Sequence, residues 1–172
     1  YAEYEEQKIA LFEQSPDLVV ASGGYVTTQV IQQSNGGYYV TGFQKGVNKQ
    51  PFVAKVNGQE VQWLEMLEMP VSSTSNLKNG YGIVMNPVRN GCLLIVRAYH
   101  QNIHRDSSAV NILFELDEEG EKRHQVILKQ KLFPEFSVKN EQDTSYIIAY
   151  RSKPGSREAL PEMLISNVGL DG

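Results

Sequence analysis

The 172-residue sequence predicts an all-β fold built from about three four-stranded antiparallel units. Apolar residues alternate with polar ones or form short runs, and helical periodicity is weak along the chain. Asn-Gly pairs, the strongest short signal for a β-hairpin, occur four times. Strand-like runs of similar sequence also recur at a spacing of about 55 residues. These features together predict repeated antiparallel sheets joined by tight turns.

The first two strands of each unit are expected on either side of a turn. The first strands are expected at 24–28, 80–84 and 136–138. The second strands are the β-rich runs 38–43, 93–98 and 145–150, at offsets of 55 and then 52 residues. Neighbouring sheets should cover both faces of these second strands. The positions expected to be most buried are Leu93, Ile95, Tyr146 and Ile148.

The third and fourth strands of each unit complete the pattern. Third strands are expected to run into an Asn/Asp-Gly turn, at 52–58, 112–120 and 168–172. Fourth strands are expected shortly before a proline, at 7–12, 61–67 and 124–128. The Asn-Gly pairs begin at 35, 57, 79 and 90, and the pair at 79 is expected to form a turn at the junction of two units.

A four-stranded antiparallel unit repeated at this interval is the sequence form of a β-propeller blade. We therefore predict that residues 1–172 form a single all-β propeller segment of about three blades. The approximate units are 1–16 (the end of a preceding blade), 24–70, 80–134 and 135–172. A β-sandwich or a closed barrel is the alternative, but neither explains why strands ending in Gly and strands ending in Pro recur in order.

Three blades are too few for a ring, because propellers typically need at least four. We therefore expect the chain to be a stretch of a longer propeller polypeptide, with contacts to further blades or to another subunit. The alternative is that two copies complete a ring through their edge strands. An uncovered edge at 168–170 would favour association of the free chain.

Composition excludes several classes of function. The chain has 16 Lys+Arg and 20 Asp+Glu, which gives a formal net charge of -4. Nucleic acid is therefore not expected as a partner, because no basic field is available to attract phosphates. No apolar run approaches the roughly twenty residues of a membrane-spanning helix. The single cysteine, Cys92, excludes an internal disulfide and any multi-thiolate metal site, and it reads as a small buried apolar residue.

The segment 36–43, followed by 52–58 and Trp63, resembles the repeats of bacterial β-propeller proteins. In that pattern a Gly-Gly-aromatic strand precedes a Phe-Val-x-Lys strand, an Asn/Asp-Gly turn and a Trp strand. The second unit departs from it, because Arg97 replaces the strand-ending Gly and Glu115 replaces the Lys. The resemblance implies a secreted, periplasmic or cell-surface bacterial protein.

Candidate site residues are few. His100 and His104 have the i, i+4 spacing of two metal ligands, with Asp106 as a third, but the segment reads as an exposed polar loop. Arg151 and Arg157 belong to the only basic cluster, and the acidic residue that follows Arg157 favours a surface loop over an anion pocket. These five residues are the candidates for binding. No metal, no cofactor and no catalytic residue is predicted.

Two further groups are interpreted as structural. The acidic run 117–121 lacks the alternating spacing of a calcium loop and reads as a solvated hairpin turn. The aromatic residues Tyr38, Tyr39 and Trp63 are expected in the core between blades rather than on a ligand.

These observations predict a non-catalytic binding or scaffolding module with a protein or glycan partner. The alternative is part of a propeller enzyme, either glycan-active or an oxidoreductase, whose catalytic residues lie outside this chain. Titratable side chains that converge on one place would favour an enzyme, whereas apolar patches on a rim or sheet face would favour a scaffold.

Overall fold

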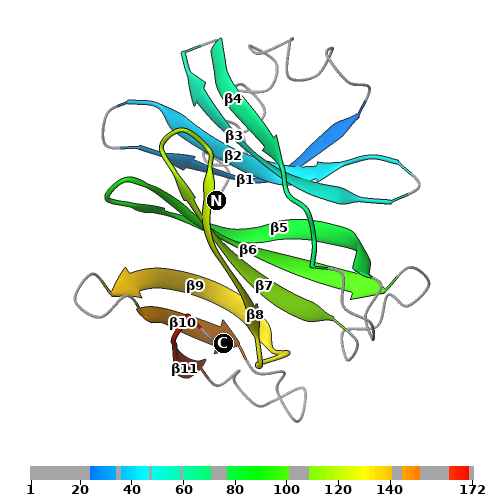
Figure 1. Cartoon of the computed structure of the whole chain (residues 1–172), viewed down its shortest axis with the longest axis vertical. Coiled ribbons are helices and arrows are strands. Elements are labelled where there is room, and N and C mark those ends of the chain that lie inside the picture. Colours follow the sequence, from blue (N-terminus) through cyan, green and yellow to red (C-terminus); the bar gives the residue numbers. More distant parts are fainter. Residues whose placement is uncertain are drawn as a thin grey trace, which may run out of the picture.

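The structure is a computed structural model that describes residues 24–33, 36–46, 48–58, 60–70, 77–100, 109–140, 145–151 and 163–170. Every regular element in these residues is a β-strand, so the predicted all-β class is confirmed. The eleven strands form three antiparallel sheets, none of which closes into a barrel (Figure 1). The described residues include no helix long and apolar enough to cross a membrane.

The first sheet has the strand order β1-β2-β3-β4. Its strands are β1 (Tyr25–Gln32), β2 (Tyr38–Gln44), β3 (Gln50–Asn57) and β4 (Glu60–Met66). Aromatic and β-branched residues make up most of β2, and β3 carries Phe52, Val53 and Val56; such residues pack well on a pleated surface. The two strands are accordingly the most buried part of this sheet.

The middle sheet repeats this order as β5-β6-β7-β8, and the last sheet has the order β11-β10-β9. The middle strands are β5 (Leu77–Val88), β6 (Gly91–His100), β7 (Val110–Asp117) and β8 (Lys122–Leu128). The last strands are β9 (Phe133–Asn140), β10 (Ser145–Arg151) and β11 (Met163–Val168).

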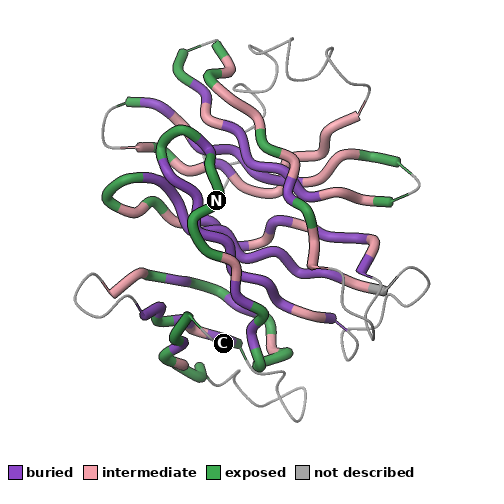
Figure 2. Tube along the Cα trace, viewed as in Figure 1, coloured by how far each residue is buried: buried purple, intermediate pink, exposed green. Residues whose placement is uncertain are grey.

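The sheets are stacked face to face, with the middle sheet between the other two (Figures 1 and 2). One apolar core fills the space between the first and middle sheets and includes Tyr39, Leu94 and Phe114. A second core lies between the middle and last sheets. It contains all four positions predicted to be most buried, each with 0% exposure: Leu93, Ile95, Tyr146 and Ile148. Strand β6 is buried on both faces, as a near-continuous apolar run predicts.

Each sheet has a β-bulge where its first strand pairs with its second. The register skips Thr28, Ile83 and Glu135 at these bulges, and a second shift in β5 skips Lys78. Bulges increase the local twist of a strand. The first strands of successive sheets are also joined by polar contacts. The backbone N–H of Met85 donates to Gln29 Oε1 at 2.6 Å, and the Asn86 amide donates to Ser137 Oγ at 3.3 Å.

The connections divide the stack into two ends. Turns between first and second strands, and between third and fourth strands, lie at one end, which we call the hairpin end. Connections between second and third strands, and those from one sheet to the next, lie at the other, which we call the loop end. In Figure 1 the β2–β3 connection is on the right of the molecule.

One predicted turn is wrong, because Asn79-Gly80 lies inside β5. Asn79 Oδ1 accepts the backbone N–H of Lys49 at 3.0 Å, and the Gly80 N–H donates to Lys49 O at 2.7 Å. A Cβ at Gly80 would stand 2.7 Å from the Met69 sulfur. Glycine is therefore present for close approach between sheets, not for a turn. In the other three pairs the glycines have positive φ: Gly36, Gly58 and Gly91.

The third strand of the last sheet also differs from the prediction. It is β11, at Met163–Val168, rather than 168–172, because the apolar run that begins at Met163 pairs with the end of β10. The prediction placed the strand too late along the chain. The predicted strand at 7–12 lies outside the described residues.

Candidate functional site

Aromatic and cationic side chains from all three sheets form a continuous series of contacts at the loop end. We call this series the aromatic–cation row. Its members are Phe43, Lys49, Tyr81, Arg97, Tyr99, Phe133, Glu135 and Arg151.

The row begins between the first and middle sheets. Lys49 Nζ lies 5.3 Å from the ring centre of Phe43 and 5.0 Å from that of Tyr81. It also donates a hydrogen bond to the Tyr81 hydroxyl at 2.9 Å. The Phe43 and Tyr81 rings meet edge to face with their centres 4.9 Å apart, a preferred geometry for aromatic pairs. Two rings from different sheets thus hold one ammonium group.

The row continues along the middle sheet. The ring centres of Tyr81 and Tyr99 are 5.9 Å apart, and Arg97 Nε donates to the Tyr99 hydroxyl at 3.2 Å. Tyr81 and Arg97 are direct cross-strand partners of β5 and β6, which places both side chains on one face.

The row ends on the last sheet. The Phe133 ring has the Arg97 guanidinium 5.5 Å from its centre and the Arg151 guanidinium 5.8 Å from it. Arg151 Nε forms an ion pair with Glu135 Oε1 at 2.7 Å. Phe133 remains 39% exposed, and so it offers an accessible ring flanked by cations.

Arg97 is fixed by the connection between the middle and last sheets. Arg97 is only 4% exposed, and its guanidinium donates to Asn111 Oδ1 at 3.0 Å and to the carbonyl oxygens of Lys131 and Leu132. The Asn111 amide in turn donates to the carbonyl of Leu132 at 2.8 Å. These bonds hold the start of β9, and with it Phe133, at a fixed place beside Arg97.

The row carries more positive than negative charge. It contains three cations and one carboxylate, and among the described residues no carboxylate forms an ion pair with Lys49. A hollow of about 400 Å3 is lined by Asn48 and Gln50, the residues on either side of Lys49 in the chain. Its lining residues come from the β2–β3 connection, β3, the link from β4 to β5, and β5: Asn48, Gln50, Leu67, Glu68, Met69, Leu77 and Lys78.

The structure places only some of the predicted candidates. Arg151 belongs to the row, and His100 is the last residue of β6, at the same end of the stack. His104, Asp106 and Arg157 lie outside the described residues. In the described part of the chain no three metal-ligating side chains form a group that could hold an ion.

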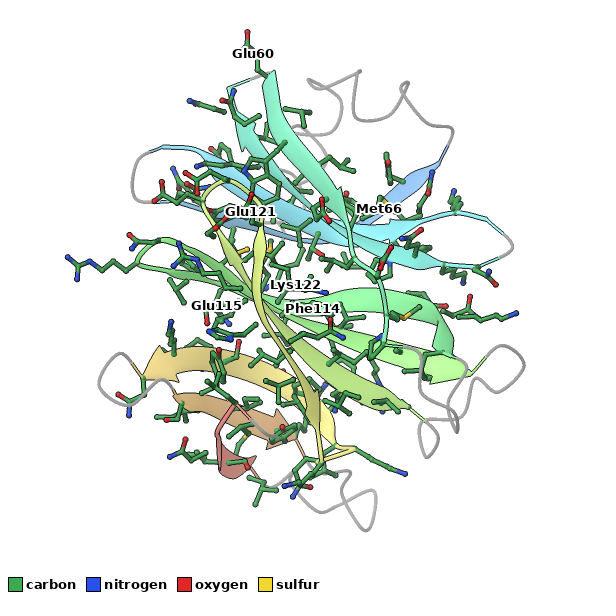
Figure 3. The ribbon with its side chains drawn as sticks, viewed as in Figure 1. Glu60, Met66, Phe114, Glu115, Glu121 and Lys122 are labelled. Atoms are coloured by element: carbon green, nitrogen blue, oxygen red, sulfur yellow. The ribbon has the colours of Figure 1, made fainter. Side chains whose placement is uncertain are left out.

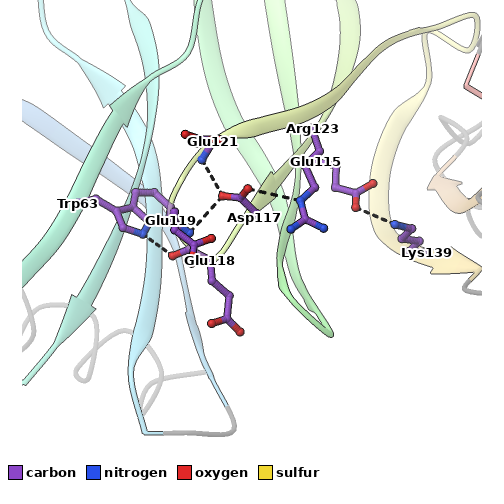
Figure 4. A network of polar contacts seen from close by, with 8 residues as sticks. All are labelled: Trp63, Glu115, Asp117, Glu118, Glu119, Glu121, Arg123 and Lys139. Atoms are coloured by element: carbon purple, nitrogen blue, oxygen red, sulfur yellow. Dashed lines mark hydrogen bonds and ion pairs between the residues drawn. The ribbon is translucent and has the colours of Figure 1, made fainter.

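At the hairpin end, the acidic run 117–121 forms a turn (Figure 4). Asp117 Oδ1 accepts the backbone N–H groups of Glu119 at 3.1 Å and Glu121 at 2.8 Å. Burial raises the pKa of the Asp117 carboxyl. These hydrogen bonds and Arg123 together lower it by more than burial raises it, so the pKa lies below its ordinary value. The carboxylate is therefore committed to closing the turn, which agrees with the interpretation of this run as a hairpin.

The same turn connects the middle sheet to the first. Trp63 Nε1 donates to the carbonyl oxygen of Glu118 at 2.7 Å, and the Tyr39 and Trp63 ring centres are 5.9 Å apart. Tyr39 and Trp63 thus contribute to the core between sheets, as predicted. Tyr38 does not, because its neighbour Tyr39 takes the inward face and Tyr38 packs on the opposite side of the first sheet.

A buried ion pair lies between the middle and last sheets. Phe114 faces the first sheet, and the adjacent Glu115 therefore faces the last (Figure 3). Glu115 is 3% exposed and receives hydrogen bonds from Lys139 Nζ and the Tyr146 hydroxyl, both at 2.7 Å. Every group in this cluster has a partner from the opposite sheet, so the cluster joins the middle and last sheets.

Cys92 is fully buried, as predicted, and burial raises the pKa of its thiol to about 12. The thiolate, which is the reactive form, is therefore not populated near neutral pH. The loop end offers a different chemistry, recognition of a ligand by aromatic rings and cations.

Sequence reasoning did not find the row. Only Arg151 was a candidate, and Arg97 was noted for replacing a glycine at a strand end. That replacement was the available signal, because a charged residue in an otherwise apolar strand needs a polar partner.

No protein-family model matches the chain, and no curated protein sequence matches it.

Proposed function

We propose that this chain is a non-catalytic binding module of the β-propeller type and that it binds an acidic glycan at its loop end. The aromatic–cation row is the observation that carries the proposal. The sheet arrangement supports the propeller type, and the composition of the row supports the class of ligand.

The bulges show which residues of the three sheets are equivalent. Gly42, Val96 and Tyr150 occupy the same place relative to the three bulges, and they are 54 residues apart in each case. The offsets expected from sequence, 55 and 52, differ from this one by one and two residues. A shift of one residue moves a side chain to the opposite face of a sheet.

Residues that are equivalent at the spacing of 54 show that the sheets stack head-to-tail. Tyr39, Leu93 and Ile147 are equivalent at this spacing. Tyr39 faces the middle sheet, Leu93 faces the last sheet, and Ile147 points outward on the far side. Each sheet therefore uses the same face to contact the next one. This order, with the first strands of successive sheets in contact, supports the arrangement of propeller blades.

The same equivalence relates contacts within the row. Phe43, Arg97 and Arg151 hold equivalent positions at this spacing. Phe43 contacts Tyr81 of the following sheet, and Arg97 contacts Phe133 of the following sheet. The row is thus a recurring contact at one end of the stack that crosses all three sheets, with Arg97 buried in it and Phe133, Glu135 and Arg151 exposed.

The chemistry of the row favours an acidic glycan. Sugar rings have apolar faces that stack on aromatic side chains, and Phe133 and Tyr81 supply such surfaces. Carboxylate or sulfate groups are bound by guanidinium and ammonium groups, which Arg151 and Lys49 supply on either side. A neutral sugar would leave these cations unused.

Isothermal calorimetry tests the proposal. The chain is titrated with tetragalacturonate, an acidic oligosaccharide, and with maltotetraose, a neutral one with the same number of sugar units. We expect binding of the acidic probe with a Kd of about 1 mM or lower, weakening as salt rises. Lys49→Gln and Arg151→Gln should each weaken it at least about fivefold, or roughly 1 kcal/mol.

Lys122→Gln is the matched control, because it removes the same charge from the hairpin end, where Lys122 only contacts Gln125. This variant should bind as the unaltered chain does. Equal affinity for the two probes, no binding of either, or an equal loss in Lys122→Gln would each contradict the proposal.

A further inference from the structure

Asn-Gly pairs are chemically reactive as well as turn-forming. The backbone nitrogen of the glycine attacks Cγ of the asparagine side chain, and the absence of a Cβ on the glycine leaves the approach open. The new N–Cγ bond closes a succinimide ring, while the Cγ–Nδ2 bond breaks and ammonia leaves with the proton that the glycine N–H gives up. Water then opens the ring at either carbonyl and leaves an aspartate or an isoaspartate. How freely the two reacting groups meet differs from one pair to the next in this fold.

The pair Asn57-Gly58 is open to this reaction. Asn57 is the last residue of β3, Gly58 follows it in the β3–β4 turn, and both residues are exposed. A Cβ built on Gly58 would meet nothing within 4 Å, so the glycine faces open space. Neither the Asn57 side-chain amide nor the Gly58 N–H forms a hydrogen bond with another residue of the described ranges. No described contact therefore keeps the two reacting groups apart.

The pair Asn79-Gly80 is the opposite case. Asn79 is 6% exposed, and its Oδ1 accepts the backbone N–H of Lys49 at 3.0 Å. The Gly80 N–H, which would have to attack, donates to Lys49 O at 2.7 Å. Both reacting groups are thus bonded to the first sheet. A reaction at Asn79 requires local opening of the contact between the first and middle sheets, and such opening costs free energy.

The pair Asn90-Gly91 lies between these extremes. Asn90 is exposed, but Gly91 is buried at the start of β6, where it pairs with residues of β5 and β7. A Cβ at Gly91 would overlap Leu116 O, so the neighbouring strand lies directly against this backbone. The reaction here requires the first residue of β6 to leave its sheet. The fourth pair begins at Asn35, which lies outside the described residues.

We propose that Asn57 is a site of spontaneous modification in the folded protein. Gly58 N attacks Asn57 Cγ, ammonia is released, and water converts the succinimide into aspartate and isoaspartate. Asn79 is spared, because its side chain and the following N–H are held by Lys49. This inference does not depend on the glycan proposal, since Asn57 lies at the hairpin end and the aromatic–cation row lies at the loop end.

The modification changes the β3–β4 hairpin in two ways. It adds a negative charge at position 57, opposite Glu60, which is its cross-strand partner and projects from the tip of this hairpin (Figure 3). Like charges directly opposite each other on neighbouring strands are destabilising. The isoaspartate product also adds a methylene to the backbone, and the register of a hairpin depends on the length of its turn. The reaction therefore weakens the pairing of β3 with β4 at the hairpin end.

Peptide mapping by mass spectrometry measures the reaction at each asparagine. The folded chain, and the chain unfolded in guanidinium chloride, are incubated at the same mildly alkaline pH, and the aspartate and isoaspartate peptides are quantified over time. In the folded chain Asn57 should react at least about a hundredfold faster than Asn79, which corresponds to an opening free energy of roughly 2.7 kcal/mol at Asn79. Asn90 should react at an intermediate rate. In the unfolded chain the three rates should agree within about fivefold, because no opening is then needed.

Gly58→Ala tests the attacking atom, because the added Cβ hinders the approach of the nitrogen. It should slow the reaction at Asn57 at least about tenfold. Gly36→Ala is the matched control, since Gly36 also has a positive φ and open space around it, and it should leave the rate at Asn57 unchanged. Circular dichroism spectra show whether both variants keep their fold.

Three results would overturn the proposal. The first is equal rates at Asn57 and Asn79 in the folded chain. The second is a reaction at Asn57 that occurs only in guanidinium chloride, which would mean that the turn protects it. The third is an unchanged rate at Asn57 in a folded Gly58→Ala variant. The comparison of the folded with the unfolded chain uses the natural sequence, so it decides the matter even if Gly58→Ala does not fold.

Discussion

Glu115 of the middle sheet and Lys139 of the last sheet form an ion pair with an N–O distance of 2.7 Å, and the side chains are only 4% and 17% exposed. The Tyr146 hydroxyl donates to the second carboxylate oxygen at 2.7 Å. Burial raises the pKa of Glu115, but the hydrogen bonds from Lys139 and Tyr146 outweigh burial and lower the pKa below its ordinary value. The charged form of Glu115 is thus bound more tightly in the folded state than in the unfolded chain.

This relationship predicts acid sensitivity. A carboxyl with a lowered folded-state pKa stabilises the fold above its unfolded pKa, and this stabilisation is lost as pH falls through the lower folded pKa. Glu115→Gln should cost about 1–3 kcal/mol at pH 7, because Lys139 is left without its partner. The variant should also lose less stability than the unaltered chain between about pH 5 and pH 2. Urea melts across this pH range measure both effects.

Glu119→Gln is the control for this prediction, since Glu119 is exposed at the hairpin end and uses its backbone N–H, not its carboxylate, to bond Asp117. It should change the free energy of unfolding by less than about 0.5 kcal/mol. An unchanged pH profile in Glu115→Gln would show that the ion pair is not the source of acid sensitivity.

Two neighbouring isoleucines of β10 provide a matched test of burial. Ile148 has no exposed area and belongs to the core between the middle and last sheets, so Ile148→Ala should cost about 2–5 kcal/mol. Ile147 is 37% exposed on the other face. Ile147→Ala should cost less than about 1 kcal/mol, because this side chain keeps much of its contact with water in the folded state. Equal losses in denaturant melts would mean that the face assignment of β10 is wrong.

The sequence predicted the all-β class, the β6 core residues and three of the four Asn-Gly turns, because these features depend on residues close together in the chain. A run such as Cys92–Val96 is strand-like wherever it lies, and a glycine with positive φ marks a turn by itself. The spacing of 54 residues was missed because similar apolar runs do not show which residues of β2, β6 and β10 are equivalent, and the register that shows it depends on bulges, each of which inserts one extra residue into the neighbouring strand. Sequence patterns alone do not reveal such insertions.

The aromatic–cation row could not be predicted for a different reason. Lys49 Nζ donates a hydrogen bond to the Tyr81 hydroxyl at 2.9 Å, although a whole β-hairpin and a link between sheets separate the two residues in the chain. Which residues meet at the loop end depends on how the sheets stack, and that in turn depends on the register. The same holds for Asn79-Gly80, whose partner Lys49 lies in another sheet and overrides the local turn preference.

The close approach at Gly80 can be tested by adding one methyl group. In Gly80→Ala the new Cβ would lie 2.7 Å from the Met69 sulfur and 3.1 Å from the Pro51 ring, so part of the contact between the first and middle sheets must shift. We expect a loss of about 1–3 kcal/mol in the free energy of unfolding. Gly46→Ala is the control, because its Cβ would meet only Asn48 O at 3.3 Å. A neutral Gly80→Ala variant would show that the two sheets are not held so close.

The hydrogen bond from Trp63 to the Glu118 carbonyl joins the first and middle sheets at the hairpin end, and its contribution to stability can be measured. Trp63→Phe keeps an aromatic ring beside Tyr39 but removes the Nε1–H that donates at 2.7 Å. We expect a loss of about 1–2 kcal/mol, from the hydrogen bond and the smaller ring. Lys55 donates to the same carbonyl over a longer distance, 3.3 Å, so Lys55→Met should cost less than about 0.5 kcal/mol. Urea melts of the two variants give the comparison, and a larger loss in Lys55→Met would mean that the ammonium, not the indole, holds the turn against the first sheet.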